Sequence, residues 1–187
     1  MSRQNQIVLS LGSNIGNRLE TIKSSIAIIH AEIATVVKVS SVYETPSWGF
    51  ESEPFYNCAI LIHTSKSAQR ILSQVLKVEK QLGRIRTNDK TYQARIIDID
   101  IISCNEEVIS TENLEIPHKQ MSNRKFVLLP MHDLGMNWMH PKLKKSIPEL
   151  LQICKDESEC VVVEKLTSPI EKLNLQNFNY IAIEGNI

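Results

Sequence analysis

The sequence predicts an α+β protein whose strands and helices follow one another in the order β-α-β-β-α-β. Four β-branched, apolar runs separated by polar turns predict strands over residues 6–13, 35–45, 55–64 and 95–102. Between the first and second runs, and again between the third and fourth, apolar residues recur three or four positions apart, which predicts two amphipathic helices. This order is the split arrangement of a ferredoxin-like sandwich.

Each predicted helix has start and stop signals. Asn17–Glu20 has the spacing of a capping box, and the apolar residues that follow are Leu19, Ile22, Ile26, Ile29 and Ile33. Ser65 or Ser67 caps the second helix, whose inner side carries Ile71, Leu72, Val75, Leu76 and Leu82. Gly83 stands where a helix-ending glycine belongs, and the polar segment 84–94 is predicted to be a loop.

The sequence beyond residue 104 predicts additional elements outside the β-α-β-β-α-β unit. Residues 105–108 predict a hairpin turn, and residues 123–134 and 146–154 predict helices, the second capped by Ser146. Residues 160–166 and 179–185 predict a possible late hairpin. We therefore expect a main domain over residues 1–159 and a C-terminal extension over 160–187, either a packed hairpin or a tail.

Composition excludes several classes of protein. Lys plus Arg and Asp plus Glu both number 21, so no overall basic field favours nucleic acid or an anionic membrane. No run approaches the roughly 18 apolar residues of a membrane span. The four cysteines form no zinc-binding pattern. These features predict a cytoplasmic protein.

The stretch RIIDIDII, residues 95–102, places two aspartates in an apolar strand. Side chains alternate along a strand, so Asp98 and Asp100 share one face about 6.5 Å apart, while the isoleucines between them face the core. Two adjacent carboxylates repel, and Mg²⁺ is a cation that such oxygen ligands take, usually alongside substrate phosphates. The alternative is an exposed face on which both aspartates meet only water or lysines.

Arginines gather around this strand in the sequence. Arg84 and Arg86 begin the polar segment and Arg95 ends it. Guanidinium groups suit phosphate oxygens, although a single loop arginine is often only a solvated charge. Carboxylates that hold a metal, with arginines around it, are typical of phosphoryl transfer.

Two further segments carry aromatic and polar side chains together. Phe55 and Asn57 point the same way in their strand, and a ring beside an amide suits a flat heterocycle, although simple packing also accounts for them. His118, Arg124 and Phe126 gather in a turn-like segment. The turn LGSNIGNR, residues 11–18, lacks both common glycine-rich phosphate-binding patterns.

Six segments, in order over roughly residues 6–135, resemble the 6-hydroxymethyl-7,8-dihydropterin pyrophosphokinases of folate biosynthesis: SLGSNIGNR, SSVYETPSWG, PFYNCAI, VEKQLGRIR, ARIIDIDII and IPHKQMSNRKFVLLP. The resemblance implies that residues 1–159 are a pyrophosphokinase domain of ferredoxin-like fold. It also implies transfer of the terminal pyrophosphate of ATP to the hydroxymethyl group of the pterin, leaving AMP.

The resemblance assigns the site residues. It implies two Mg²⁺ ions held by Asp98 and Asp100, with Arg84 and Arg95 as catalytic residues. ATP would contact Glu79, Arg84, Arg86, Tyr92, Arg95, Ile101, Leu114, His118 and Arg124. The pterin would contact Thr45, Pro46, Trp48, Phe55, Asn57 and Phe126, with the two phenylalanine rings on either side of it. The protein would be a monomer or weak dimer with no nucleic-acid or membrane partner.

Two other functions remain open. Nucleotidyl transfer also uses a Gly-Ser turn and paired aspartates, but Gly12 and Asp98 are far apart in this sequence. A non-catalytic RNA-binding module on the same fold would need a basic surface and strand aromatics. The zero net charge and 5% aromatic content disfavour it.

Overall fold

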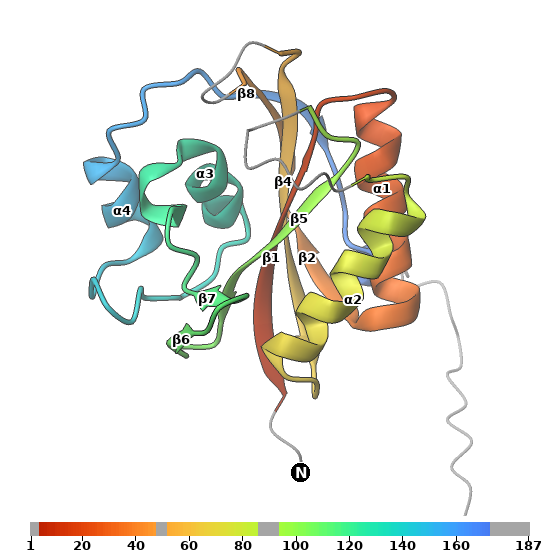
Figure 1. Ribbon diagram of the computed structural model, residues 1–187. Helices are drawn as coiled ribbons and strands as arrows, with labels where there is room; N and C mark the ends of the chain where they lie inside the picture. Colours follow the sequence, from red (N-terminus) through yellow and green to blue (C-terminus); the bar gives the residue numbers. More distant parts are fainter. Residues whose placement is uncertain (1–3, 48–51, 86–93, 173–187) are drawn as a thin grey trace, which may run out of the picture.

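A six-stranded antiparallel sheet with helices on both faces forms the centre of the computed structural model, which describes residues 4–47, 52–85 and 94–172 (Figure 1). The strands of this sheet are β1 (Asn5–Ser13), β2 (Thr35–Val39), β3 (Ser41–Thr45), β4 (Phe55–Thr64), β5 (Asp98–Cys104) and β8 (Val161–Lys165). The helices are α1 (Arg18–Ile28), α2 (Ala68–Gln81), α3 (Lys125–Asp133), α4 (Ile147–Ile153) and α5 (Pro169–Lys172). A separate pair, β6 (Ile109–Ser110) and β7 (Glu115–Ile116), forms a small second sheet.

The strand order is β5-β1-β4-β3-β8, and β2 also pairs with β4. The mixed α+β architecture is therefore confirmed. The two central strands, β1 and β4, are those that the predicted β-α-β-β-α-β order places in the middle. The central position of β1 puts its end beside both β5 and β4.

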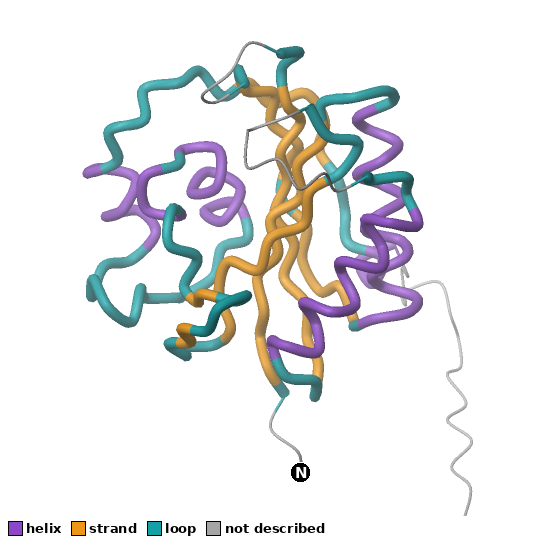
Figure 2. Tube along the Cα trace, in the orientation of Figure 1, coloured by secondary structure: helices purple, strands orange, loops and turns teal. Residues whose placement is uncertain are grey.

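The sheet separates two apolar cores, with a helical layer on each side (Figure 2). Alternate residues of β1 belong to different cores: Ile7 and Leu9 face α1 and α2, whereas Val8 faces α3 and α4. Each fully buried aliphatic side chain contributes about 1.5–3 kcal/mol relative to exposure. The α3–α4 layer thus covers a sheet face that would otherwise expose apolar residues.

The helix signals agree with the structure. Asn17 Oδ1 accepts a hydrogen bond from Glu20 N at 3.3 Å and begins α1, whose last turn continues as a π-helix, Ile29–Ile33. Ser67, rather than Ser65, caps α2. Gly83 follows α2 at φ +93°, in the left-handed region that glycine adopts without strain. Ser146 caps α4 in a complete capping box.

Two predicted strands have different limits. The strand over 35–45 divides at Ser40, because the Ser40 hydroxyl accepts the hydrogen bond of Ala59 N at 2.9 Å and interrupts the ladder. The strand over 95–102 begins only at Asp98. Arg95 instead exchanges hydrogen bonds with Asn14, from its N to Asn14 Oδ1 at 2.6 Å and from Asn14 N to its carbonyl at 3.0 Å.

The first arm of the predicted late hairpin is β8, which pairs antiparallel with β3 at the edge of the sheet. The second arm, residues 179–185, lies outside the described residues. The division of the chain at residue 160 stays a prediction. Within the described ranges, every helix is too short or too polar to cross a membrane.

Candidate active site

The aspartates of β5 lie on one face of the strand. Ile97, Ile99 and Ile101 are buried in the core with α1 and α2, and Asp98 and Asp100 face the opposite side. This is the arrangement that the period-two spacing predicts. Both aspartates remain partly accessible, at the end of the sheet where the polar segment 84–94 joins β5.

Gly12 lies between the acidic strand and the predicted pterin strand. In register it is opposite Asp98 of β5 on one side and opposite Asn57 of β4 on the other. Two strand spacings put these partners about 10 Å apart. A Cβ atom on Gly12 would lie 3.1 Å from Asn57 Oδ1 and 3.7 Å from the Phe55 ring. The absence of a side chain at Gly12 therefore leaves space between Asp98 and Asn57.

Two arginines compensate the charge of Asp98. Arg84 donates to Asp98 Oδ1 and to Glu79, and Arg95 donates to Asp98 Oδ2. Burial lowers the pKa of Arg84, but the charges of Asp98 and Glu79 outweigh this effect and raise it above its ordinary value. Both predicted catalytic arginines therefore converge on one predicted metal ligand.

Glu79 fixes this arrangement from α2. Its side chain is 1% exposed, and its Oε1 accepts the hydrogen bond of Ile99 N at 2.8 Å. β5 is an edge strand, so this outward N–H has no neighbouring strand to accept it. Glu79 thus satisfies the strand edge and orients Arg84 with the same carboxylate.

Asp100 has a surplus of negative charge around it. Burial, together with the charges of Asp98 and Glu79, raises its pKa to about 7, against the opposing effect of Arg124 and Arg95. A cation would stabilise the ionised form, and paired carboxylate oxygens are suitable Mg²⁺ ligands. Among the described residues no three or more His, Cys, Asp or Glu side chains gather as a metal centre. Mg²⁺ at this pair would take its other ligands from water and substrate phosphates.

A cavity of about 420 Å³ adjoins the acidic face, and four predicted site residues line it: Asp100, Ile101, Leu114 and His118. A second cavity of about 550 Å³ is lined by Glu79, Arg84 and Leu76, and Leu76 also lines the first. The two spaces are therefore neighbours, on either side of α2 residue Leu76. Together they offer room for an elongated ligand along the edge of β5.

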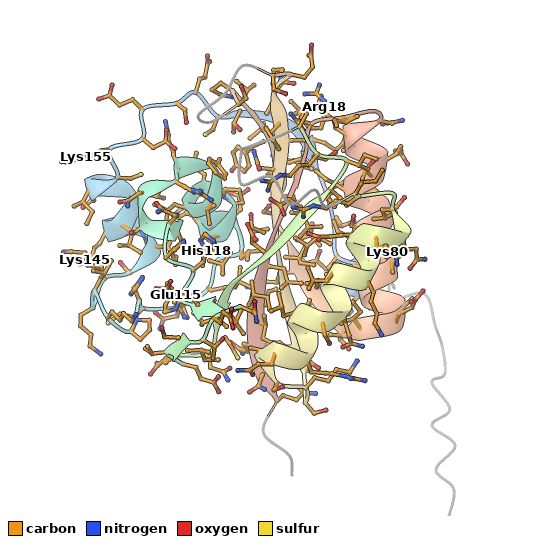
Figure 3. All side chains as sticks on the ribbon, viewed as in Figure 1. Arg18, Lys80, Glu115, His118, Lys145 and Lys155 are labelled. Atoms are coloured by element: carbon orange, nitrogen blue, oxygen red, sulfur yellow. The ribbon has the colours of Figure 1, made fainter. Side chains whose placement is uncertain are left out.

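His118 follows β7 on the α3 side of the sheet (Figure 3). Its backbone N donates to Ile102 O at 2.9 Å, and its Nδ1 accepts from Gln120 N at 3.3 Å. Burial and the charge of Arg124 lower the pKa of His118 to about 4. The imidazole is therefore neutral near pH 7, with Nε2 as its hydrogen-bond donor.

The predicted pterin residues lie on β3, β4 and α3. Asn57 is buried and its Nδ2 donates to Thr45 Oγ1 at 2.8 Å, which fixes the amide. Phe55 lies opposite Thr45 across the β3–β4 ladder. Phe126, at the start of α3, is partly buried, with the Arg124 guanidinium 5.6 Å from its ring centroid. Pro46 is exposed.

Three predicted site residues lie outside the described residues: Trp48, Arg86 and Tyr92. Their predicted contacts with the pterin and with ATP stay predictions. The other fourteen are divided between the acidic strand with its surroundings and the β3–β4 end of the sheet with the start of α3.

Two site residues were missed in the sequence, Gly12 and Asn14. Asn14 holds Arg95 as described above, and its Nδ2 also donates to Ser52 Oγ at 2.7 Å and Glu53 O at 3.3 Å. It therefore links the segment before β4 to the segment before β5. A glycine within a strand is a known signal of close approach, but no local pattern distinguishes Asn14.

Comparison with known proteins identifies a family model and several similar sequences. The family model of 7,8-dihydro-6-hydroxymethylpterin-pyrophosphokinase (HPPK) matches residues 8–136. A 2-amino-4-hydroxy-6-hydroxymethyldihydropteridine pyrophosphokinase of Porphyromonas gingivalis is 38% identical over 140 residues, covering 73% of this chain and 94% of that protein. One of Bacillus subtilis is 40% identical over 128 residues, covering 67% and 75%.

Longer proteins also match. The folic acid synthesis protein fol1 of Pneumocystis carinii is 36% identical over 142 residues, which are 75% of this chain but only 19% of that protein. A crystal structure of Plasmodium falciparum HPPK-DHPS with pteroate superposes with a TM-score of 0.66 at 16% identity, covering 81% of this chain and 41% of that one. At this low identity the superposition supports the fold alone.

The fold and the site define an α+β protein with two groups of polar residues separated by Gly12. One group is Asp98 with its arginines, and the other is the buried Asn57 amide beside the Phe55 ring. Membership follows from the family match, which spans more than half of the chain, and from relatives at 35–40% identity. The chain belongs to the 7,8-dihydro-6-hydroxymethylpterin-pyrophosphokinase (HPPK) family.

Proposed function

We propose that the protein transfers a pyrophosphoryl group from ATP to 6-hydroxymethyl-7,8-dihydropterin, giving AMP and the pterin diphosphate, as a monomer or weak dimer in the cytoplasm. The observation that carries this proposal is the row Asp98–Gly12–Asn57, in a chain of this family. The row places Asp98 and Asn57 about 10 Å apart, which supports metal and phosphate at one end and a flat polar heterocycle at the other.

The neutral end of the row suits the pterin. The Asn57 amide, held by Thr45, offers its Oδ1 to donors on the heterocycle edge. Phe55 and Phe126 supply aromatic faces for the ring, and Pro46 and Trp48 complete the proposed contacts. A pterin held there over Gly12 would direct its hydroxymethyl group toward Asp98.

The charged end suits Mg²⁺ and ATP. Asp98 and Asp100 would hold the metal, proposed as two ions, which supplies positive charge to the phosphate oxygens when bound. The nucleotide would occupy the space lined by Ile101, Leu114 and His118. Glu79, Arg86, Tyr92 and Arg124 are the remaining proposed ATP contacts.

Arg84 and Arg95 both donate hydrogen bonds to Asp98. When substrate phosphates are present, the same guanidinium groups would donate to the β- and γ-phosphate oxygens and stabilise the negative charge that develops during transfer. The pterin hydroxyl oxygen attacks the β-phosphorus, the bond from that phosphorus to the α–β bridging oxygen breaks, and AMP leaves with the electron pair. The hydroxyl proton passes to solvent in this proposal, which assigns no side chain as general base and relies on positioning and charge neutralisation.

The test is product analysis after incubation with ATP, Mg²⁺ and 6-hydroxymethyl-7,8-dihydropterin. AMP and the pterin diphosphate should form in equal amounts. Release of inorganic pyrophosphate would instead indicate nucleotidyl transfer. Salt-sensitive RNA binding without turnover would indicate an RNA-binding module.

A further inference from the structure

Arg18, the first residue of α1, occupies a position that its helix does not favour. The amide end of a helix carries partial positive charge and stabilises acidic rather than basic side chains. The Arg18 side chain is nevertheless only 23% exposed. Its contacts with residues distant in the sequence therefore explain its position better than any helical preference.

The Arg18 guanidinium makes three contacts of different kinds. Its Nη1 lies 3.1 Å from Glu44 Oε2 and donates to the Pro54 carbonyl at 2.6 Å. Its Cζ lies 3.8 Å from the centroid of the Tyr56 ring. Glu44 precedes the segment 45–53, and Pro54 and Tyr56 follow it, so one side chain connects the residues before and after this segment.

The residues that Arg18 contacts are neighbours in the strands of the proposed pterin residues. Glu44 and Tyr56 are cross-strand partners on β3 and β4, and Thr45 pairs with Phe55 in the next position. Because side chains alternate, Arg18 contacts one face of this ladder while the proposed pterin contacts use the other. Figure 3 shows Arg18 at the end of the α1 layer, beside these strand ends.

We infer that Arg18 is a positioning residue for the pterin site. It contacts the face of the β3–β4 ladder opposite to the proposed pterin contacts, and it thereby fixes the orientation of Phe55 and Asn57. The inference rests on the proposed function, because the pterin is the ligand proposed for this end. A lone exposed ion pair would contribute little. The short bond to the Pro54 carbonyl and the stacking on Tyr56 need the planar, multiply donating guanidinium, which lysine lacks.

The test compares Arg18→Met with Lys23→Met. Lys23 lies on the same helix and makes an exposed ion pair with Glu20 at 3.1 Å, so its loss is a matched control for removing a cation from α1. Dissociation constants for the pterin and for a non-hydrolysable ATP analogue are measured with Mg²⁺, together with the thermal unfolding midpoint. Arg18→Met should weaken pterin binding about tenfold and ATP binding less than about twofold.

Arg18→Lys should recover only part of the loss, and Lys23→Met should leave both affinities unchanged. Equal pterin affinity in Arg18→Met and Lys23→Met would overturn the inference. So would a parallel fall of both affinities with the unfolding midpoint, which is the signature of a merely structural role.

A second measurement needs no ligand. Amide hydrogen exchange in Arg18→Met should quicken at Thr45, Phe55 and Asn57, while the amides of β5 keep the wild-type rate. Unchanged exchange at the β3–β4 end contradicts the inference. Failure of the wild-type protein to bind the pterin would refute the proposed function, and the exchange experiment would still decide the role of Arg18.

Discussion

The two ends of the Asp98–Gly12–Asn57 row are built in different ways. At the neutral end, Asn57 is buried, bonded to Thr45 and held in a paired strand. At the charged end, Asp98 is satisfied by the guanidinium groups of Arg84 and Arg95. Both residues belong to paired strands, but the Asn57 side chain is held by a neutral hydrogen bond and the Asp98 side chain by ion pairs among groups proposed to bind the metal and ATP.

The difference predicts how each end receives its ligand. If the pterin binds as proposed, Asn57 is already oriented by Thr45, so binding there would require little rearrangement and would retain more of the contact energy. Under the same proposal, metal and phosphate would compete with the contacts that Arg84 and Arg95 make with Asp98. Substitutions at the two ends should therefore affect different measured quantities.

The largest expected effect is that of Asp100→Asn at the charged end. The substitution keeps the shape and removes one proposed metal ligand, so kcat/KM should fall by about a hundredfold to a thousandfold. Steady-state AMP formation measures the loss, and fluorescence titration should give an unchanged pterin affinity. Retention of full turnover would remove the metal assignment.

Gly12→Ala should affect the neutral end most. The new Cβ would lie 3.1 Å from Asn57 Oδ1, so the amide must move or the site must widen. At about 1–3 kcal/mol for overpacking, pterin binding should weaken by roughly fivefold to 150-fold. Calorimetric titration with the pterin and with an ATP analogue measures both affinities. An equal loss of both would show that the two ends are not separate.

Thr45→Val tests the bond that orients Asn57. Valine has a similar shape but no acceptor for Asn57 Nδ2, so pterin affinity should fall by about 1 kcal/mol, roughly fivefold. Thr45→Ser retains the hydroxyl and serves as the control. If Thr45→Val binds the pterin as tightly as Thr45→Ser does, the hydrogen bond does not orient the amide for binding.

The smallest effect concerns His118 and stability. Its pKa falls from 6.5 to about 4 on folding, because burial and Arg124 disfavour the charged imidazole. As pH decreases from 6.5 toward 4, the unfolded chain takes up a proton that the folded chain does not, so the free energy of unfolding decreases. Above 6.5 the group is neutral in both states and contributes no pH dependence.

His118→Asn, whose Oδ1 can still accept from Gln120 N, should remove this component. Unfolding midpoints from pH 7.5 to 4.5 should therefore fall less steeply for the variant than for the wild-type protein. Parallel curves would place the pKa of His118 at its ordinary value.

Local patterns in the sequence predict the acidic face and the helices correctly. The alternation of Ile97, Asp98, Ile99 and Asp100 is a property of one strand and needs no knowledge of its neighbours. Asn17, Ser67 and Gly83 are likewise local signals for the limits of α1 and α2.

The features missed in the sequence all depend on contacts between distant segments. The role of Gly12 follows from a register that places β1 between β5 and β4. Asn14 and Arg18 act through residues on other segments, and the hydroxyl of Ser40 divides β2 from β3 only because Ala59 N meets it. The order of the elements predicts that β1 lies in the middle of the sheet, but neither composition nor periodicity encodes which residues of neighbouring strands become partners.

The central place of β1 has a consequence for the growing polypeptide. Gly12 is synthesised early, yet its two neighbours arrive with β4 and, last of the three, with β5. Such non-local pairing makes folding slow compared with that of helical domains. A nascent chain that ends before Asp98 thus carries Gly12 and Asn57 but has no acidic strand, so the complete Asp98–Gly12–Asn57 row can form only after β5 has left the ribosome.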